Sequence, residues 1–393
     1  MVKRHYVIDI WLLTLSFFFA ATGMYAAEPV IVGADRMDEI KKLVKNKRVG
    51  LIANQTSVLQ DGRHLLDALL EENIRMIKVF APEHGFRGTE EAGESVLNGR
   101  DSKTGVPIVS IYGANNKPSA SQLADIDMVI FDIQDVGARF YTYISTMHYA
   151  MEACAENGKQ FIVLDRPNPN DYVDGPVRKI GFSSFVGVDP IPVLHGLTVG
   201  ELARMINGEG WIKTGKHSCK LHVVRMKNWA HGDLYHVPIG TSPNLPNNIA
   251  IRLYPSLCFF EGTNISVGRG TTFPFQALGG PDEKYGDFTF VPTPIKGMDS
   301  NPMHKDVVCY GTDYRDSIFE GGLSLRFVIG FYIKSGPNEK EFFARPNWFD
   351  LLAGTDVLRK QIIQGYSEEE IRATWKDELN EYNKTRRKYL IYN

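Results

Sequence analysis

Short apolar runs alternate with segments of helical periodicity between residues 48 and 166. The apolar runs are rich in β-branched and aromatic side chains, which is typical of buried strands. The expected strands are Arg48–Asn54, Met76–Ala81, Pro107–Ile111, Asp127–Ile133 and Phe161–Asp165. The expected helices are His64–Glu72, Ser119–Ile126 and Ser145–Asn157. This alternation predicts an α/β fold built on a Rossmann-like parallel sheet with helices on both faces.

The pattern changes from His195 onward, and a second, smaller α/β domain is expected there. The segment Thr198–Asn207 opens with T-x-x-E, the capping-box signature of a helix start. Further elements are expected as strands at Leu221–Met226 and Leu323–Ile333 and as helices at Trp348–Gln364 and Ser367–Tyr389. We therefore predict a catalytic domain at residues 28–190, a second domain at 191–393, and an active-site cleft between them.

The first 26 residues have the pattern of a secretory signal peptide. Lys3 and Arg4 precede an apolar run from Ile10 to Thr22, and small residues follow, ending in Ala26–Ala27. The run is shorter than the about 20 residues that span a bilayer as a helix. We expect an exported, periplasmic protein without stable membrane insertion after cleavage.

Composition narrows the class of protein. Hydrophobic residues make up 43% of the 393 residues and charged residues 23%, which excludes a disordered, fibrous or polytopic membrane protein. The net charge of −2 gives no basic field for nucleic acid. The four cysteines fit neither a zinc site nor a CxxC redox motif, so we expect mostly free, buried thiols.

Two nucleotide-binding motifs are absent. The sequence after the first expected strand reads ANQTS instead of GxGxxG, and the chain has no GxxxxGK followed by Ser or Thr. A Rossmann-like sheet without these motifs does not indicate a binding site for a dinucleotide or a nucleoside triphosphate. We therefore expect no cofactor.

Polar side chains follow the expected strands. Because the carboxyl ends of parallel strands meet at one edge of a sheet, these side chains should share one rim. The candidates there are Asn54, Glu83, His84, Asp132, Gln134, Arg139, Tyr141, Tyr143, Asp165 and Asn168. Candidates from the second half are His195, Asn244, Asn247, Glu261, Arg269 and Thr271. Such groups suit the hydroxyls of a sugar and a carboxylate-bearing substrate.

Six motifs in this order resemble the exo-β-N-acetylmuramidase family: PEHGFRG, DIQDVGARFYTY, LDRPNP, HGLTVGELA, SPNLPN and the YP…FEGTN…GRGT run. The resemblance covers essentially the whole chain after the signal peptide. It implies a glycosidase that removes terminal N-acetylmuramic acid from the non-reducing end of peptidoglycan fragments. It also implies a Rossmann-like catalytic domain, and it puts the emphasis on the glutamate of PEHG, Glu83.

Glycosidases commonly use two carboxyl groups, one as acid and one as base or nucleophile. Glu83 is the expected general acid/base, and His84 orients it or binds substrate. The second carboxylate stays open between Glu261 and the pair Asp132 and Asp135. The structural alternative for that aspartate pair is helix capping and ion pairing.

The lactyl ether that distinguishes N-acetylmuramic acid from N-acetylglucosamine carries a carboxylate, for which Arg139 and Arg269 are the two candidate partners. Tyr141 and Tyr143 either flank a sugar or pack in the core. His84 with nearby aspartates could meet at an ion, but no HExxH or comparable spacing supports a site, so no metal is expected.

Two other functions fit the sequence on physical grounds. A non-catalytic periplasmic binding protein for muropeptides or acidic sugars would also have two α/β domains and a polar cleft. A metal-dependent hydrolase of esters or phosphates is the third possibility. Hydrolysis of a chromogenic β-N-acetylmuramide separates the first two, and chelators test the third.

Overall fold

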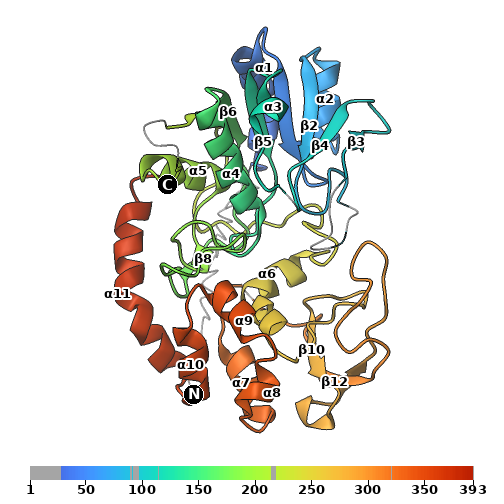
Figure 1. Ribbon diagram of the computed structural model, residues 1–393, viewed down its shortest axis with the longest axis vertical. Coiled ribbons are helices and arrows are strands. Elements are labelled where there is room, and N and C mark those ends of the chain that lie inside the picture. The colour runs from blue at the N-terminus through green and yellow to red at the C-terminus, as the bar shows by residue number, and fades with distance from the viewer. Residues whose placement is uncertain are drawn as a thin grey trace, which may run out of the picture.

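The computed structural model describes residues 28–88, 91, 97–113, 115–213, 218–319 and 321–392. The expected signal peptide lies outside these residues. A large sheet with its helices forms the upper half of Figure 1, and a mostly helical part with a small sheet forms the lower half.

Seven strands form the large sheet in the spatial order β3-β4-β2-β1-β5-β6-β9. Their bounds are Val49–Ala53 (β1), Met76–Ala81 (β2), Gly99–Arg100 (β3), Pro107–Ser110 (β4), Met128–Asp132 (β5), Gln160–Leu164 (β6) and Lys220–Val224 (β9). All neighbouring pairs are parallel except β3 with β4. Without β3, the strands follow the 3-2-1-4-5-6 order of the doubly wound Rossmann sheet. The predicted α/β fold with a Rossmann-like sheet is confirmed.

Helices cover both faces of this sheet. Successive strand residues point to opposite faces, so an apolar strand presents apolar side chains on both sides. On β5, Val129 and Phe131 join the apolar cluster that includes α4, whereas Met128 and Ile130 join the cluster that includes α1 and α2. The helices of this half are Met37–Val44 (α1), Leu65–Glu71 (α2), Ala120–Leu123 (α3), Tyr143–Glu156 (α4) and Val199–Gly208 (α5). The fully apolar strands thus reflect burial on two sides.

Strand β9 extends the large sheet beyond the domain division expected from the sequence. It pairs in parallel with β6, from Gln160 beside Lys220 to Leu164 beside Val224. Helix α5 begins with the predicted capping box, since Thr198 and Glu201 bond reciprocally. The change of sequence pattern at His195 is therefore followed by α5 and β9, which complete another strand–helix–strand crossover from β6. The large sheet thus contains residues from both sides of position 190.

The second half combines a three-stranded antiparallel sheet with six helices among the described residues. The sheet has the order β10-β12-β11, and a two-stranded ribbon pairs β7 with β8. The strands are Val173–Asp174 (β7), Leu194–His195 (β8), Ala277–Gly280 (β10), Phe288–Phe290 (β11) and Cys309–Asp313 (β12). The helices are Asn248–Leu257 (α6), Arg326–Lys334 (α7), Glu339–Phe342 (α8), Pro346–Ala353 (α9), Val357–Ile363 (α10) and Glu368–Arg386 (α11). No helix in the described part of the chain is both long and apolar enough to cross a bilayer.

Two expected elements of this half were wrong. Leu323–Ile333 was expected as a strand, but most of it forms α7, whose buried Val328, Phe331 and Tyr332 follow helical spacing. The helix expected at Trp348–Gln364 is two helices. Gly354 ends α9 with a left-handed φ of 74°, a conformation that glycine adopts without steric cost.

The C-terminal helix α11 leads back to the large sheet, along the left side of Figure 1. Ser367 and Glu370 form the predicted capping box at its start. Near its end, Tyr382 donates a hydrogen bond of 2.7 Å to the backbone oxygen of His195. Beyond it, Tyr392 donates one of 2.7 Å to the buried carboxylate of Asp165. The C-terminal segment is thereby attached to the β8 segment through Tyr382 and to the carboxyl end of the large sheet through Tyr392.

The C-terminal attachment should depend on pH through His231, because its partner Glu201 also accepts from the backbone N–H of Ile391 at 2.7 Å. Its ring bridges Asp171 and Glu201 at 3.0 Å each. Burial acts to lower the pKa of His231, but those two hydrogen bonds outweigh it and raise the pKa from 6.5 to about 9. The stabilisation is therefore complete below pH 6.5 and is lost as pH rises through 9. Chemical denaturation should show a decrease of about 3 kcal/mol in the free energy of unfolding across this window.

His231→Gln should remove most of this pH dependence, because the amide does not titrate. Equal slopes for the variant and the parent protein between pH 7 and pH 9 would assign the dependence to other groups.

Candidate active site

Glu83 lies in the turn that follows β2, within the PEHG motif. The backbone N–H of Gly85 donates to the oxygen of Pro82 at 3.0 Å, which closes the turn. His84 has a φ of 65°, in the left-handed region that non-glycine residues rarely occupy. Strained conformations of this kind concentrate at functional sites, and both Glu83 and His84 are buried.

Hydroxyl groups from two other segments hold the Glu83 carboxyl. Tyr112, just after β4, donates to Oε1 at 2.7 Å, and Thr142 donates to Oε2. The phenol of Tyr143 lies 3.4 Å from the backbone oxygen of Glu83. A hydroxyl can donate to an ionised carboxylate or accept from a protonated one, so this arrangement serves both protonation states.

Glu83 and its partners lie on the wall of a cavity of about 730 Å³, the size of a small-ligand pocket. The lining comes from both halves of the chain: loops after β2, β4 and β5 on one side, and α6, α9 and the loops around β10 on the other. The predicted cleft between a Rossmann-like domain and a second domain is therefore present. Seven of the predicted site residues line it: Glu83, His84, Tyr141, Tyr143, Asn244, Glu261 and Arg269.

A second carboxylate on the cavity wall is Glu261. Arg269 donates to its Oε1 at 2.6 Å. Burial acts to lower the pKa of Arg269, but the charge of Glu261 and the hydrogen bond between them raise it. Both side chains are about one-fifth exposed, so the pair faces the cavity. Asp299 also lines the cavity, and burial raises the pKa of its carboxyl.

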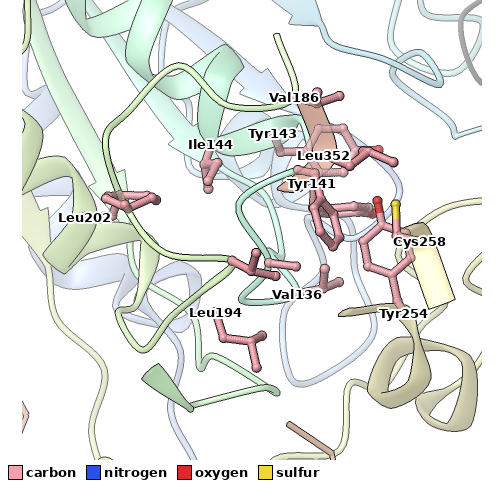
Figure 2. Close-up of a cluster of buried hydrophobic side chains, with 14 of the residues drawn as sticks. Val136, Tyr141, Tyr143, Ile144, Val186, Leu194, Leu202, Tyr254, Cys258 and Leu352 are labelled. Atoms are coloured by element: carbon pink, nitrogen blue, oxygen red, sulfur yellow. The ribbon is translucent and has the colours of Figure 1, made fainter. Parts of the chain in front are cut away.

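Tyrosines and apolar side chains line the inner part of the cavity. The rings of Tyr141 and Tyr143 meet edge to face at 4.9 Å, and Tyr141 meets Tyr254 at 5.8 Å. Figure 2 shows these rings beside Cys258 and Leu352, so the lining joins both halves of the chain. Tyr141 donates to the oxygen of Thr241 at 2.8 Å, and burial raises the pKa of its phenol. Tyr141 and Tyr143 thus pack in the core and also line the cavity, while their contact with a sugar stays a prediction.

Asp132 and Arg139, two predicted site residues, lie outside the cavity. Asp132 is fully buried, and Arg166 binds both its oxygens at 2.6 and 2.9 Å. Arg139 is also buried and donates to the backbone oxygens of Pro176, Ile191 and Leu352. Burial and the charge of Arg178 lower the pKa of Arg139 to about 9. The hypotheses of Asp132 as second carboxylate and of Arg139 as a substrate partner do not fit this geometry.

The other predicted residues at strand ends form a buried hydrogen-bond network beneath the rim. Asn54 accepts from Thr56, and Gln134 donates to Pro167. Asn168 donates to Leu197. Asp165 accepts from Thr198 and Gly200, and burial raises its pKa to about 7. His195 lies 3.3 Å from Asp135. None of the five predicted residues Asn54, Gln134, Asp165, Asn168 and His195 is in the described lining of the cavity.

Asn247 and Thr271 also serve local structure. Asn247 caps α6 by accepting from the N–H of Ala250 at 3.0 Å. Thr271 donates to the oxygen of Gly268 at 2.6 Å, inside its own loop. Asn244, by contrast, lines the cavity, and its buried Oδ1 has no partner among the described residues. An unused acceptor on a cavity wall suits a substrate N–H or O–H.

Several cavity residues were missed by the sequence analysis. Tyr112 and Thr142 stand in segments that we recognised as polar, but nothing local marks them as partners of Glu83. Arg345 and Trp348 belong to no recognised motif and reach the cavity only through the packing of α9. Among the described residues, no group of three His, Cys, Asp or Glu side chains could hold a metal ion. All four cysteines are buried and unpaired.

Removal of the Tyr112 hydroxyl should lower kcat. Tyr112→Phe leaves the ring in place but takes one donor from the Glu83 carboxylate. A hydrogen bond to a charged group is worth about 1.5–3 kcal/mol, so we expect kcat to fall at least about 10-fold with little change in KM. Tyr366→Phe is the matched control, because Tyr366 is exposed and is not part of the described lining of the cavity. A rise in KM at constant kcat would instead make Tyr112 a substrate-binding residue.

Fold and site together define a two-domain α/β enzyme with carboxylates on the wall of a polar, aromatic cavity between the two halves. Family models named for the exo-β-N-acetylmuramidase NamZ match almost the whole described chain. The N-terminal model matches residues 49–249, and the C-terminal model matches residues 252–392. The chain belongs to this family, and it is therefore a glycoside hydrolase.

Individual relatives agree with this assignment. The chain is 39% identical over 380 residues to the peptidoglycan β-N-acetylmuramidase NamZ of Bacillus subtilis, covering 91% of this chain and 89% of that protein. Two crystal structures of DUF1343 family proteins from Bacteroides fragilis are similar. One has a TM-score of 0.84 at 43% identity and the other 0.80 at 31%, each covering 93% of this chain and 99% of the other. The resemblance read from the motifs is confirmed.

Proposed function

We propose that this enzyme is an exo-acting β-N-acetylmuramidase that hydrolyses terminal, non-reducing N-acetylmuramic acid from peptidoglycan fragments. The proposal is carried by the Glu83 carboxyl, which Tyr112 and Thr142 hold at the wall of the cavity. It is supported by the activity named for the Bacillus subtilis relative, at 39% identity.

Glu83 is the general acid/base in this proposal. When protonated, it can pass its proton to the glycosidic oxygen as the bond to the sugar breaks. Once ionised, it can take a proton from the attacking water, and its two hydroxyl partners hold the carboxyl in place throughout. Glu261 is the proposed second carboxylate, because it lies on the cavity wall and the ion pair with Arg269 holds its side chain in place. A negative charge there would stabilise the positive charge that develops on the sugar ring.

The test uses two kinds of substrate with the purified enzyme. A chromogenic β-N-acetylmuramide reports turnover, and a defined oligosaccharide with N-acetylmuramic acid at its non-reducing end reports the position of cleavage. We expect colour release and free N-acetylmuramic acid as the first product from the oligosaccharide. Internal cleavage products would contradict the exo action. Saturable binding of the substrate without hydrolysis would contradict the enzymatic function and favour a non-catalytic binding protein.

We also propose that the chain is exported to the periplasm. The basic head, short apolar run and small-residue end of residues 1–26 support this. Cell fractionation followed by N-terminal sequencing should find a mature chain that begins close to residue 27 in the periplasmic fraction. A full-length chain in the cytoplasm would contradict it.

A further inference from the structure

Two arginines belong to the described lining of the cavity, Arg269 and Arg345. They differ in their partners. Arg269 is engaged by Glu261 at 2.6 Å. Arg345 is exposed, and no carboxylate in the part of the chain that the structure describes forms an ion pair with it. The cavity therefore contains one arginine whose charge is balanced locally and one whose charge is available to a ligand.

Arg345 is held at a fixed place on the wall. Its backbone N–H donates to the oxygen of Gly262 at 2.9 Å, which places it beside the segment that carries Glu261. Its guanidinium lies 5.4 Å from the centre of the Trp348 ring, within the range of a cation–π contact. A side chain restrained in this way loses less conformational entropy when it binds an anion.

Trp348, beside Arg345, also lines the cavity and carries a further N–H donor. Its Nε1 is buried and has no hydrogen-bond acceptor among the described residues. A buried N–H without an acceptor is costly, so a ligand oxygen placed within hydrogen-bond distance of it would bind favourably. Arg345 and Trp348 together offer a charge and several N–H donors, the arrangement that suits a carboxylate.

We propose that Arg345, with Trp348 beside it, binds the lactyl carboxylate of N-acetylmuramic acid and is the residue that selects this sugar over N-acetylglucosamine. This inference rests on the proposed function, because only that substrate brings a lactyl group into the cavity. It replaces the two arginines expected from the sequence. Arg139 is buried away from the cavity, and Arg269 would have to give up its pairing with Glu261.

The principal experiment compares variants on matched ligands. Arg345→Ala and Arg345→Lys are assayed for kcat and KM on the chromogenic β-N-acetylmuramide and on the corresponding β-N-acetylglucosaminide. We expect Arg345→Ala to lower kcat/KM on the muramide about 10–150-fold, mainly through KM, and to leave any activity on the glucosaminide unchanged. Lysine should restore only part of the loss, because its point charge cannot form the planar fork. Arg326→Ala, at an exposed arginine outside the cavity, is the matched control.

A binding measurement makes the result independent of turnover. Inhibition constants are determined for N-acetylmuramic acid and for its methyl ester, in which the lactyl charge is removed. The parent enzyme should prefer the acid, and Arg345→Ala should bind both alike. Trp348→Phe keeps the ring under the guanidinium but lacks Nε1, and it should lose about 10-fold in affinity for the acid alone.

The outcomes separate the two proposals. If the parent enzyme does not cleave the muramide, the proposed function is wrong. A parent enzyme that cleaves it, with a variant Arg345→Ala that keeps the full preference for the acid over the ester, overturns only the role of Arg345. Equal losses on both substrates and both inhibitors would also overturn it, since they indicate a structural effect.

Discussion

Glu83→Gln should lower kcat on a β-N-acetylmuramide by about 10²–10⁴-fold, the usual contribution of general acid/base catalysis. The substitution keeps the shape of the side chain but removes its titrating proton. The amide can still bond to Tyr112 and Thr142, so the turn and the cavity wall should keep their geometry. Substrate affinity should accordingly change little, and steady-state kinetics separates kcat from KM.

The control for this experiment is Glu369→Gln on the exposed face of α11, which removes the same charge far from the cavity. It should leave kcat and KM unaltered. Turnover within a few-fold of the parent enzyme in a folded Glu83→Gln variant would remove Glu83 from the mechanism. Glu261 and Asp299 would then be the carboxyls to test next.

Asp132→Asn should destabilise the protein by about 3–5 kcal/mol, the usual cost of removing one partner of a buried ion pair. The buried guanidinium of Arg166, in the loop after β6, would then face a neutral amide, with only the oxygen of Val58 as a further acceptor among the described residues. This loss is large against the 5–15 kcal/mol of a typical domain. Urea denaturation should therefore show a much lower midpoint, while kcat of the folded fraction stays within a few-fold.

Asp127→Asn is the matched control, because Asp127 pairs with Arg48 at the surface, where water screens the interaction. It should change the midpoint far less than Asp132→Asn. A stable Asp132→Asn variant with a strongly reduced kcat would reverse the interpretation and make Asp132 a catalytic group.

The sequence by itself determined the architecture of the sheet and the position of its main catalytic candidate. The central strands β1, β5 and β6 are short apolar runs because both faces of the sheet are covered there, and such runs are visible without tertiary information. The end of β2, which was predicted in the same way, locates Glu83 at the carboxyl edge of the sheet. Local signals also predicted the starts of two helices. Thr198 and Ser367 are the N-cap residues of α5 and α11, and each forms a capping box with the glutamate three residues later.

Polar residues at the other strand ends could not be sorted from the sequence. Glu83 and Asp132 both follow apolar strands, yet one reaches the cavity and the other binds Arg166 inside the fold. The difference depends on Arg166, Thr142 and Tyr112, which come from other segments. No periodicity in the chain reports which of two carboxylates meets a guanidinium and which meets hydroxyls.

The far wall of the cavity was decided by tertiary structure alone. Arg345 and Trp348 are more than 250 residues from Glu83 in the chain, and they reach the same cavity because α9 packs against the segment Cys258–Gly262. The choice between Arg139 and Arg269 could not be made from the sequence for the same reason, since burial and pairing depend on how distant segments pack in the folded protein. Local sequence therefore specifies which residues can carry a charge, and the packing of distant segments decides which charges remain available to a substrate.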